Sequence, residues 1–271
     1  MKKVFLLCSS IGLVISLMAQ ESSFRRTNNP VMRYWAISLG NSSQWMYDEA
    51  VSFVRYKGSG MAPALGLIKE SDRKYREFFF KPTFNTLSTD RSNELRPMEV
   101  KTTRILLDYM YLVKIRPWND KIKLYAGADF NWLFNLKRAE QLDNSQLLYD
   151  YSLSIGAAGK IDRSVRFKNR NCLASADLRL PLVAHIARPQ YLNRIEFIDP
   201  KNDFVGDLFR NSTLTSFNKY IRVITGLSFT YPLFNKNVLK LGYSWDFYKM
   251  RTINSVYSAE HLVSISFLSN Y

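Results

Sequence analysis

The feature that most constrains the fold is a period of two: from about residue 31 onward, apolar and polar residues alternate along long segments. In the segment 219–233, Ile221, Val223 and Leu227 alternate with Arg222 and Gly226. Such alternation is typical of β-strands whose two faces meet different surroundings. The segments run for about 11 residues or more, whereas strands of soluble proteins average about 5–6. A tilted strand that crosses a bilayer needs about 9–11 residues.

Small residues are frequent on the polar face of these segments. They are Gly127, Ser152, Ser154, Gly156, Gly226, Ser228, Gly242 and Ser244. Small residues mixed with charges suit the crowded lumen of a narrow closed barrel. The apolar face carries aromatic residues near segment ends, such as Trp132, Phe229 and Trp245, as interfacial girdles require. We therefore predict an all-β transmembrane antiparallel up-and-down β-barrel, with a secreted soluble β protein as the alternative.

The N-terminus has the order of a secretory signal peptide. A basic start, Met1 to Lys3, precedes an apolar stretch from Val4 to Ala19, and small or polar residues follow. We predict that residues 1–19 are a signal peptide and that residues 20–271 form a single barrel domain. A mean hydropathy of −0.20 and the lack of another long apolar run exclude a helical membrane bundle.

Ten segments are predicted to be strands. They are 31–41, 60–70, 77–87, 101–115, 121–136, 146–161, 171–184, 219–233, 237–250 and 257–269. With both chain ends on the periplasmic side, the turns 116–120 and 234–236 fall on that side as well. The long connections 42–59, 88–100 and 185–218 then become extracellular loops. Residues 45–56 could hold a further strand, which would raise the count to twelve.

The C-terminal segment from His261 to Tyr271 ends on an aromatic residue, and Val263, Ile265 and Phe267 share its parity. This segment resembles the closing strand of Gram-negative outer-membrane β-barrels. The resemblance implies outer-membrane localisation and recognition by the barrel-assembly machinery. The Ala-Gln at the end of the signal peptide, the high Tyr, Phe, Asn and Lys content and the basic balance resemble barrels of Bacteroidota. The resemblance names no subfamily, so it transfers no functional residue.

Charged residues of both signs lie on the predicted polar face. They are Arg104, Asp108, Lys114, Lys123, Asp129, Asp150, Asp177, Arg179, Arg222, Lys240 and Asp246. This near balance predicts a lumen filled by paired charges, whereas an anion-selective pore would have a one-sided basic lining. The whole chain has a formal net charge of +15. We expect the excess outside the lumen, in residues 73–76, 137–138 and 163–170, where it suits lipid A phosphates, phospholipid head groups or an acidic partner.

The sequence offers little for catalysis or metal binding. His261 is three residues from Ser264 and five from Ser266, so neither serine shares its strand face, and no serine follows His185 closely. The local His-x-Ser pair of barrels that cleave lipid acyl chains is therefore absent. Residues 199–207 group three carboxylates without the order of a calcium-binding loop. We predict no catalytic residue, no metal and no cofactor.

The longest predicted loop carries large apolar side chains, among them Phe197, Phe204, Leu208 and Phe209. A loop of this kind folds into the barrel mouth or meets a partner. The function we expect is therefore non-enzymatic: an accessory or scaffold subunit of an outer-membrane assembly, with a mostly filled lumen. A small-solute channel is the alternative, a lipid-modifying enzyme is less favoured, and nucleic acid is not expected as a partner.

Overall fold

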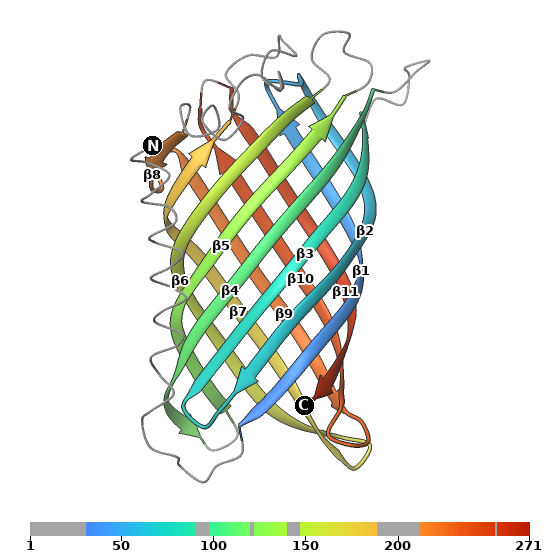
Figure 1. Cartoon of the computed structure of the whole chain (residues 1–271), viewed down its shortest axis with the longest axis vertical. Coiled ribbons are helices and arrows are strands. Elements are labelled where there is room, and N and C mark those ends of the chain that lie inside the picture. The colour runs from blue at the N-terminus through green and yellow to red at the C-terminus, as the bar shows by residue number, and fades with distance from the viewer. Residues whose placement is uncertain (1–30, 90–97, 120–121, 140–146, 189–211, 253) are drawn as a thin grey trace. The chain divides into compact units, whose positions relative to one another are not determined.

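The computed structural model describes residues 31–89, 98–119, 122–139, 147–188, 212–252 and 254–271, which form an all-β barrel (Figure 1). Its strands are β1 (Met32–Asp48), β2 (Ser52–Glu70), β3 (Lys74–Thr89), β4 (Glu99–Asn119), β5 (Ile122–Arg138), β6 (Leu147–Phe167), β7 (Arg170–Ala187), β8 (Ser212–Thr215), β9 (Tyr220–Pro232), β10 (Val238–Met250) and β11 (Val256–Asn270). Among these residues there is no helix long and apolar enough to span a membrane. The predicted signal peptide 1–19 lies outside the described residues.

The predicted closed antiparallel barrel of ten strands is confirmed. Neighbouring strands pair in chain order from β1 to β7 and from β9 to β11, β7 pairs with β9, and β1 pairs with β11. The short β8 pairs with β7 alone. The pairing partners of Asn41 can be traced from strand to strand around the ring in both directions. One direction reaches Tyr149 of β6 and the other reaches Ile161 of the same strand, so the ring closes with a stagger of twelve residues. Staggered closure of this kind tilts the strands by about 35–45°.

The barrel has two unlike ends. At the end that we call the turn end, β1 begins and β11 finishes, and tight turns follow β2, β6 and β9. Lys168, Asn169, Asn235 and Lys236 take positive φ values of 45°, 61°, 56° and 62° there, as two-residue hairpin turns require. The predicted turn 234–236 is thus confirmed. The opposite end, where the chain passes from β3 to β4, β5 to β6 and β7 to β8, is called the loop end.

The predicted loop 42–59 is wrong. β1 continues to Asp48 and β2 starts at Ser52, so residues 49–51 alone make the connection, and residues 45–56 add no further strand. The outward residues Asn41 and Ser43 are polar. The apolar alternation therefore stops before the backbone ladder does, which led the sequence pattern to end the strand too early.

Three other predicted connections are shorter in the structure. β3 extends to Thr89 and β4 begins at Glu99, so strand residues take up both edges of the predicted loop 88–100. β4 runs through most of 116–120 to Asn119, after a register irregularity that begins at Ile115. β7 extends to Ala187 and β8 occupies 212–215, so strand residues take up both edges of the predicted loop 185–218. In each case the backbone ladder continues past the point where the side-chain pattern becomes irregular.

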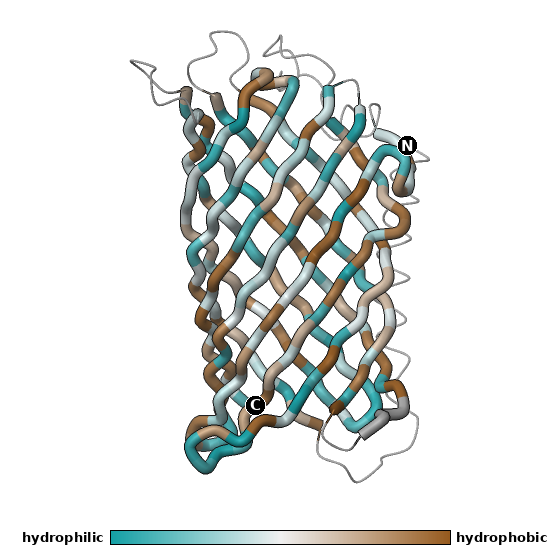
Figure 2. Tube along the Cα trace, turned by 180° about the vertical axis from the view of Figure 1, so that it is seen from behind, coloured by the Kyte–Doolittle hydropathy of each residue, from teal (hydrophilic) through white to brown (hydrophobic). Residues whose placement is uncertain are grey.

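Successive side chains of the strands alternate between the lumen and the outer surface. Hydrophilic and hydrophobic residues both occur along every strand (Figure 2). The outward positions expose a belt of large apolar residues. Members of the belt are Trp35, Ile37, Leu39, Met61, Leu65, Phe78, Phe80, Phe84, Ile155, Leu178, Leu227, Leu241, Val263, Ile265 and Phe267. A water-soluble protein would bury such a belt, whereas a bilayer covers it.

The lumen is filled in layers. Near the loop end, a layer of buried apolar side chains includes Met46, Tyr56, Leu87, Leu133, Tyr220, Tyr248 and Met250. Near the turn end, a second layer includes Tyr34, Ile68, Tyr75, Phe79, Met110, Leu112 and Tyr125. Most of the ion pairs of the lumen lie between these two layers or among their side chains.

Candidate functional site: the barrel lumen

Four charged residues form a closed cluster near the loop end. Lys137 of β5 lies 2.6 Å from Asp48 of β1 and 2.5 Å from Asp150 of β6, and all three side chains are 0% exposed. Arg188, next to the end of β7, pairs with Asp48 and lies 3.3 Å from Asp150. The hydroxyl of Tyr248 donates to Asp150 at 2.9 Å. These contacts join four strands and leave no exposed charge in the cluster.

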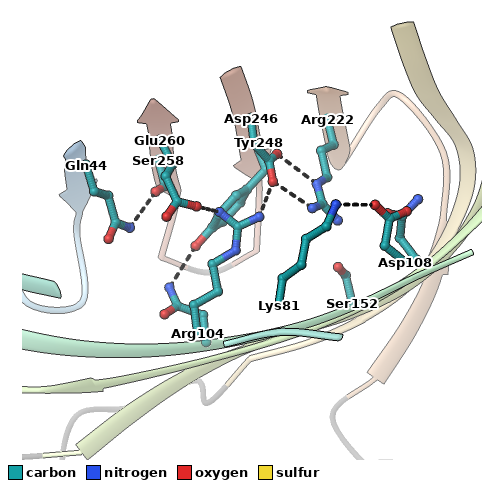
Figure 3. Close-up of polar contacts among 12 residues, drawn as sticks. Gln44, Lys81, Arg104, Asp108, Ser152, Arg222, Asp246, Tyr248, Ser258 and Glu260 are labelled. Carbon is teal, nitrogen blue, oxygen red and sulfur yellow. Dashed lines mark hydrogen bonds and ion pairs between the residues drawn. The ribbon is translucent and has the colours of Figure 1, made fainter. Parts of the chain in front are cut away.

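A second cluster crosses the middle of the lumen (Figure 3). Arg104 of β4 donates to Asp246 of β10 and to Glu260 of β11 on the opposite wall. Arg222 of β9 donates to both oxygens of Asp246, at 2.9 and 2.7 Å. The wall-to-wall contact of Arg104 is possible because lumen-facing side chains of a narrow barrel reach one another. The cluster therefore spans the bore instead of lining it.

The third cluster centres on Arg179 of β7, which is 5% exposed. It pairs with Asp108, lies 3.1 Å from Asp177 and 3.4 Å from Glu77. Lys81 of β3 reaches the same Asp108 at 2.9 Å (Figure 3). Two cations thus share one carboxylate, and three carboxylates surround one guanidinium.

Uncharged side chains continue the network towards β1. The amide of Gln44 donates to Ser258 at 2.9 Å and accepts from Asn85 at 2.8 Å and from Thr102 at 3.1 Å. Ser42 donates to Glu260 at 2.5 Å. A polar ladder from β1, β3, β4 and β11 is therefore hydrogen-bonded to the charged clusters.

Near the turn end, Lys160 lies 2.8 Å from Asp162 and 4.0 Å from the centre of the Tyr75 ring. The predicted lumen residue Lys123 is half-buried and reaches Glu70 at 3.4 Å. Lys114 is also half-buried, on the same parity of β4 as Arg104 and Asp108. Both predicted lysines thus belong to the turn-end mouth of the lumen.

A cavity of about 120 Å³ lies beside the central clusters. Its lining includes ion-paired residues of both signs, Lys240, and a wall of small residues on β9, β10 and β11. The small residues are Gly226, Ser228, Gly242, Ser244, Ser264 and Ser266. Among the described residues Lys240 has no ion-pair partner within 4.0 Å. Asp129, also predicted for the lumen, is 1% exposed and accepts from Asn131.

All eleven predicted lumen charges lie on lumen-facing positions, but sequence reasoning missed nearly as many. The additional ones are Asp48, Glu70, Glu77, Lys81, Lys137, Lys160, Asp162, Arg188 and Glu260. The expectation that Lys137 lies outside the lumen is wrong, because β5 extends past its predicted end and turns this residue inward. With the additions, basic and acidic side chains are equal in number in the described lumen. The +15 net charge of the chain is therefore carried outside it.

Basic side chains on the outer surface lie over aromatic rings near both ends. At the turn end, Arg170 lies 5.3 Å from the ring centre of Tyr231 and 5.1 Å from that of Phe234. At the loop end, Lys249 lies 4.4 Å from the ring centre of Tyr257. Such pairs suit the boundary between hydrocarbon and head groups. The predicted partner residues Phe197, Phe204, Leu208 and Phe209 lie outside the described residues.

The two histidines do not assemble a site with the serines considered from the sequence. His261 is exposed on the outer surface and its Nδ1 lies 2.8 Å from the hydroxyl of Tyr243, whereas Ser264 and Ser266 face the lumen. His185 packs edge-on against Tyr151. Among the described residues no group of three or more His, Cys, Asp or Glu could hold a metal ion. The acidic segment 199–207 lies outside them.

Comparisons with known proteins support the fold. No family model and no curated protein matches the sequence. Among solved structures, the outer-membrane protease OmpT from Escherichia coli is similar over 93% of this chain and 99% of its own, with a TM-score of 0.51 and 8% identity. The translocator domain of the autotransporter NalP from Neisseria meningitidis is similar over 100% of this chain and 98% of its own, with a TM-score of 0.42 and 11% identity. The match to OmpT shows that the chain has the fold of a Gram-negative outer-membrane β-barrel.

Proposed function

We propose that this chain is an integral outer-membrane β-barrel with a filled, non-conducting lumen, and that it acts without catalysis as an accessory or scaffold subunit of an outer-membrane assembly. The closed cluster near the loop end carries this proposal. The cluster consists of four side chains that are each 0% exposed and whose charges balance: Lys137, Asp48, Asp150 and Arg188. An ion that crossed the lumen would need hydrated charges near the loop end, where this cluster lies. If the lumen is filled, partners can bind only to the rims and the outer surface of the barrel.

A small-solute channel is the second candidate, and the cavity of about 120 Å³ is the observation that favours it. The cavity is lined by charged and apolar side chains, lies halfway along the lumen and has one wall of glycine and serine. A solute path would have to pass the apolar layer and the charge cluster near the loop end. We therefore rank the channel below the scaffold.

Single-channel recording of the purified full chain in planar bilayers separates the two candidates. We expect no stepwise conductance, because the loop-end layer excludes water. Tyr248→Ala removes a large side chain from that layer and is the positive control, for which we expect conductance steps. Phe84→Ala, on the outer surface, is the matched control and should stay silent. Steps from the unmodified chain would establish the channel and overturn the scaffold.

We also propose outer-membrane lipids as partners. If the turn end faces the periplasm, four exposed basic residues near the loop end lie at the level of lipid A phosphates: Arg55, Lys57, Lys101 and Arg138. Lys74 and Arg76, over the ring of Tyr111, lie near the turn end at the level of phospholipid head groups. The barrel-assembly machinery is a further proposed partner, on the resemblance of the β11 segment to the closing strand of outer-membrane barrels. Other outer-membrane proteins are the remaining class of partner.

A further inference from the structure

Neutral polar side chains interrupt the apolar belt where β1 pairs with β11. Asn41 and Ser43 of β1 and His261 of β11 point outward and are exposed, and Ser43 and His261 are direct cross-strand neighbours. The Asn41 and Ser43 side chains have no hydrogen bond with any described residue. We call Asn41, Ser43 and His261, with the Tyr243 hydroxyl that contacts His261 at 2.8 Å, the polar patch.

The polar patch lies within the lipid-facing height of the barrel. On β1, the outward aromatic residues are Trp35 near the turn end and Trp45 and Tyr47 near the loop end, and Asn41 is midway between Trp35 and Tyr47. Twelve residues of a strand tilted by about 40° rise about 30 Å, close to the hydrophobic thickness of a bilayer. Asn41 is therefore too deep for lipid head groups or bulk water to satisfy its hydrogen bonds.

The opposite side of the barrel shows that this is not a general property of the outer surface. Outward positions along residues 122–136 of β5 and 147–161 of β6 contain no asparagine, serine or histidine. Uncharged polar side chains exposed to hydrocarbon are costly unless a partner provides hydrogen bonds. A partner that meets them at this depth must itself be embedded in the membrane.

We infer that the polar patch is the centre of a two-fold interface with a second copy of this chain. Asn, Ser, His and Tyr each donate and accept hydrogen bonds, so the patch is complementary to itself across a two-fold axis. The outward residues between Trp35 and Tyr47 on β1, and between Phe267 and Tyr257 on β11, carry no full charge that a copy would repel. This inference rests on the proposed scaffold function and assigns that function a protein-binding surface.

Cross-linking in intact outer membranes tests the interface, in a Cys172→Ala background that removes the buried native thiol. Asn41→Cys oxidised with the membrane-permeant oxidant copper–phenanthroline should give a disulfide-linked dimer about tenfold more efficiently than Ile155→Cys, as expected for an interface stabilised by a few hydrogen bonds. Ile155, 60% exposed on β6, is the matched control on the opposite side of the ring. Equal yields from both variants, or products with other proteins only, would overturn the inference.

The double variant Asn41→Leu with His261→Leu provides a second readout. In mild detergent, the unmodified chain should have the mass of a dimer and the double variant that of a monomer, while both keep the migration of a folded barrel. A monomeric unmodified chain would overturn the interface. The two proposals can fail separately. A dimer that conducts ions contradicts the scaffold function alone, and a monomer without conductance contradicts the interface alone.

Discussion

At the scale of single residues, the lumen is stabilised by buried ion pairs, and removing one member of a pair lowers the free energy of unfolding. Arg222 is 0% exposed and makes two hydrogen bonds with Asp246. Arg222→Ala should lower the free energy of unfolding by about 3 kcal/mol, since removing one member of a buried pair typically costs about 3–5 kcal/mol and Arg104 still pairs with Asp246. Urea unfolding of the detergent-solubilised barrel measures this loss.

The neighbours Lys137 and Arg138 provide a control within one strand. Lys137 is buried between Asp48 and Asp150, whereas Arg138 is exposed on the outer surface. Replacing Lys137 by Ala should therefore destabilise the barrel as Arg222→Ala does, while Arg138→Ala should change the stability by less than about 1 kcal/mol. Unchanged stability of Arg222→Ala together with altered ion selectivity would instead indicate a hydrated pore.

At the scale of elements, the β6–β7 hairpin depends on two residues in the left-handed region. Lys168 and Asn169 have φ values of 45° and 61°. This region costs a residue with a side chain about 1–2 kcal/mol, less for asparagine. Asn169→Gly should therefore raise the free energy of unfolding by about 0.5–1 kcal/mol, and Asn169→Val should lower it. Thermal unfolding followed by circular dichroism distinguishes the two, and a stabilising valine would contradict the turn geometry.

The strands also show which features can be predicted from sequence. Alternation predicts all ten ring strands because lipid and lumen impose opposite preferences on adjacent residues. Glu77 and Lys81 could have been recognised too, since the outward Phe78 and Phe80 on the same strand fix the parity. Asp48 and Lys137 lie beyond the predicted strand ends, where no alternation assigns a face. The pairing of Arg104 with Glu260 depends on ring closure and stagger, which no local pattern contains.

At the scale of the whole molecule, closure removes every strand edge from the ring, because β1 pairs with β11. Unboiled protein in SDS should therefore migrate differently from boiled protein, and carbonate should not extract it from membranes. A variant truncated before β11, which cannot close, should lose the difference. Identical migration of the boiled and unboiled full chain would contradict the membrane barrel.

The long sequence separation between Arg104 and its partners has a consequence for assembly of the barrel in the membrane. Asp246 and Glu260 follow Arg104 by 142 and 156 residues, on the last two strands of the chain. Until those strands arrive, a growing sheet would present an uncompensated guanidinium to hydrocarbon, which is costly. Strands added to the membrane one at a time would meet this obstacle halfway through. An inserted intermediate that lacks the contacts of β4 with β10 and β11 would therefore leave this guanidinium without its partners.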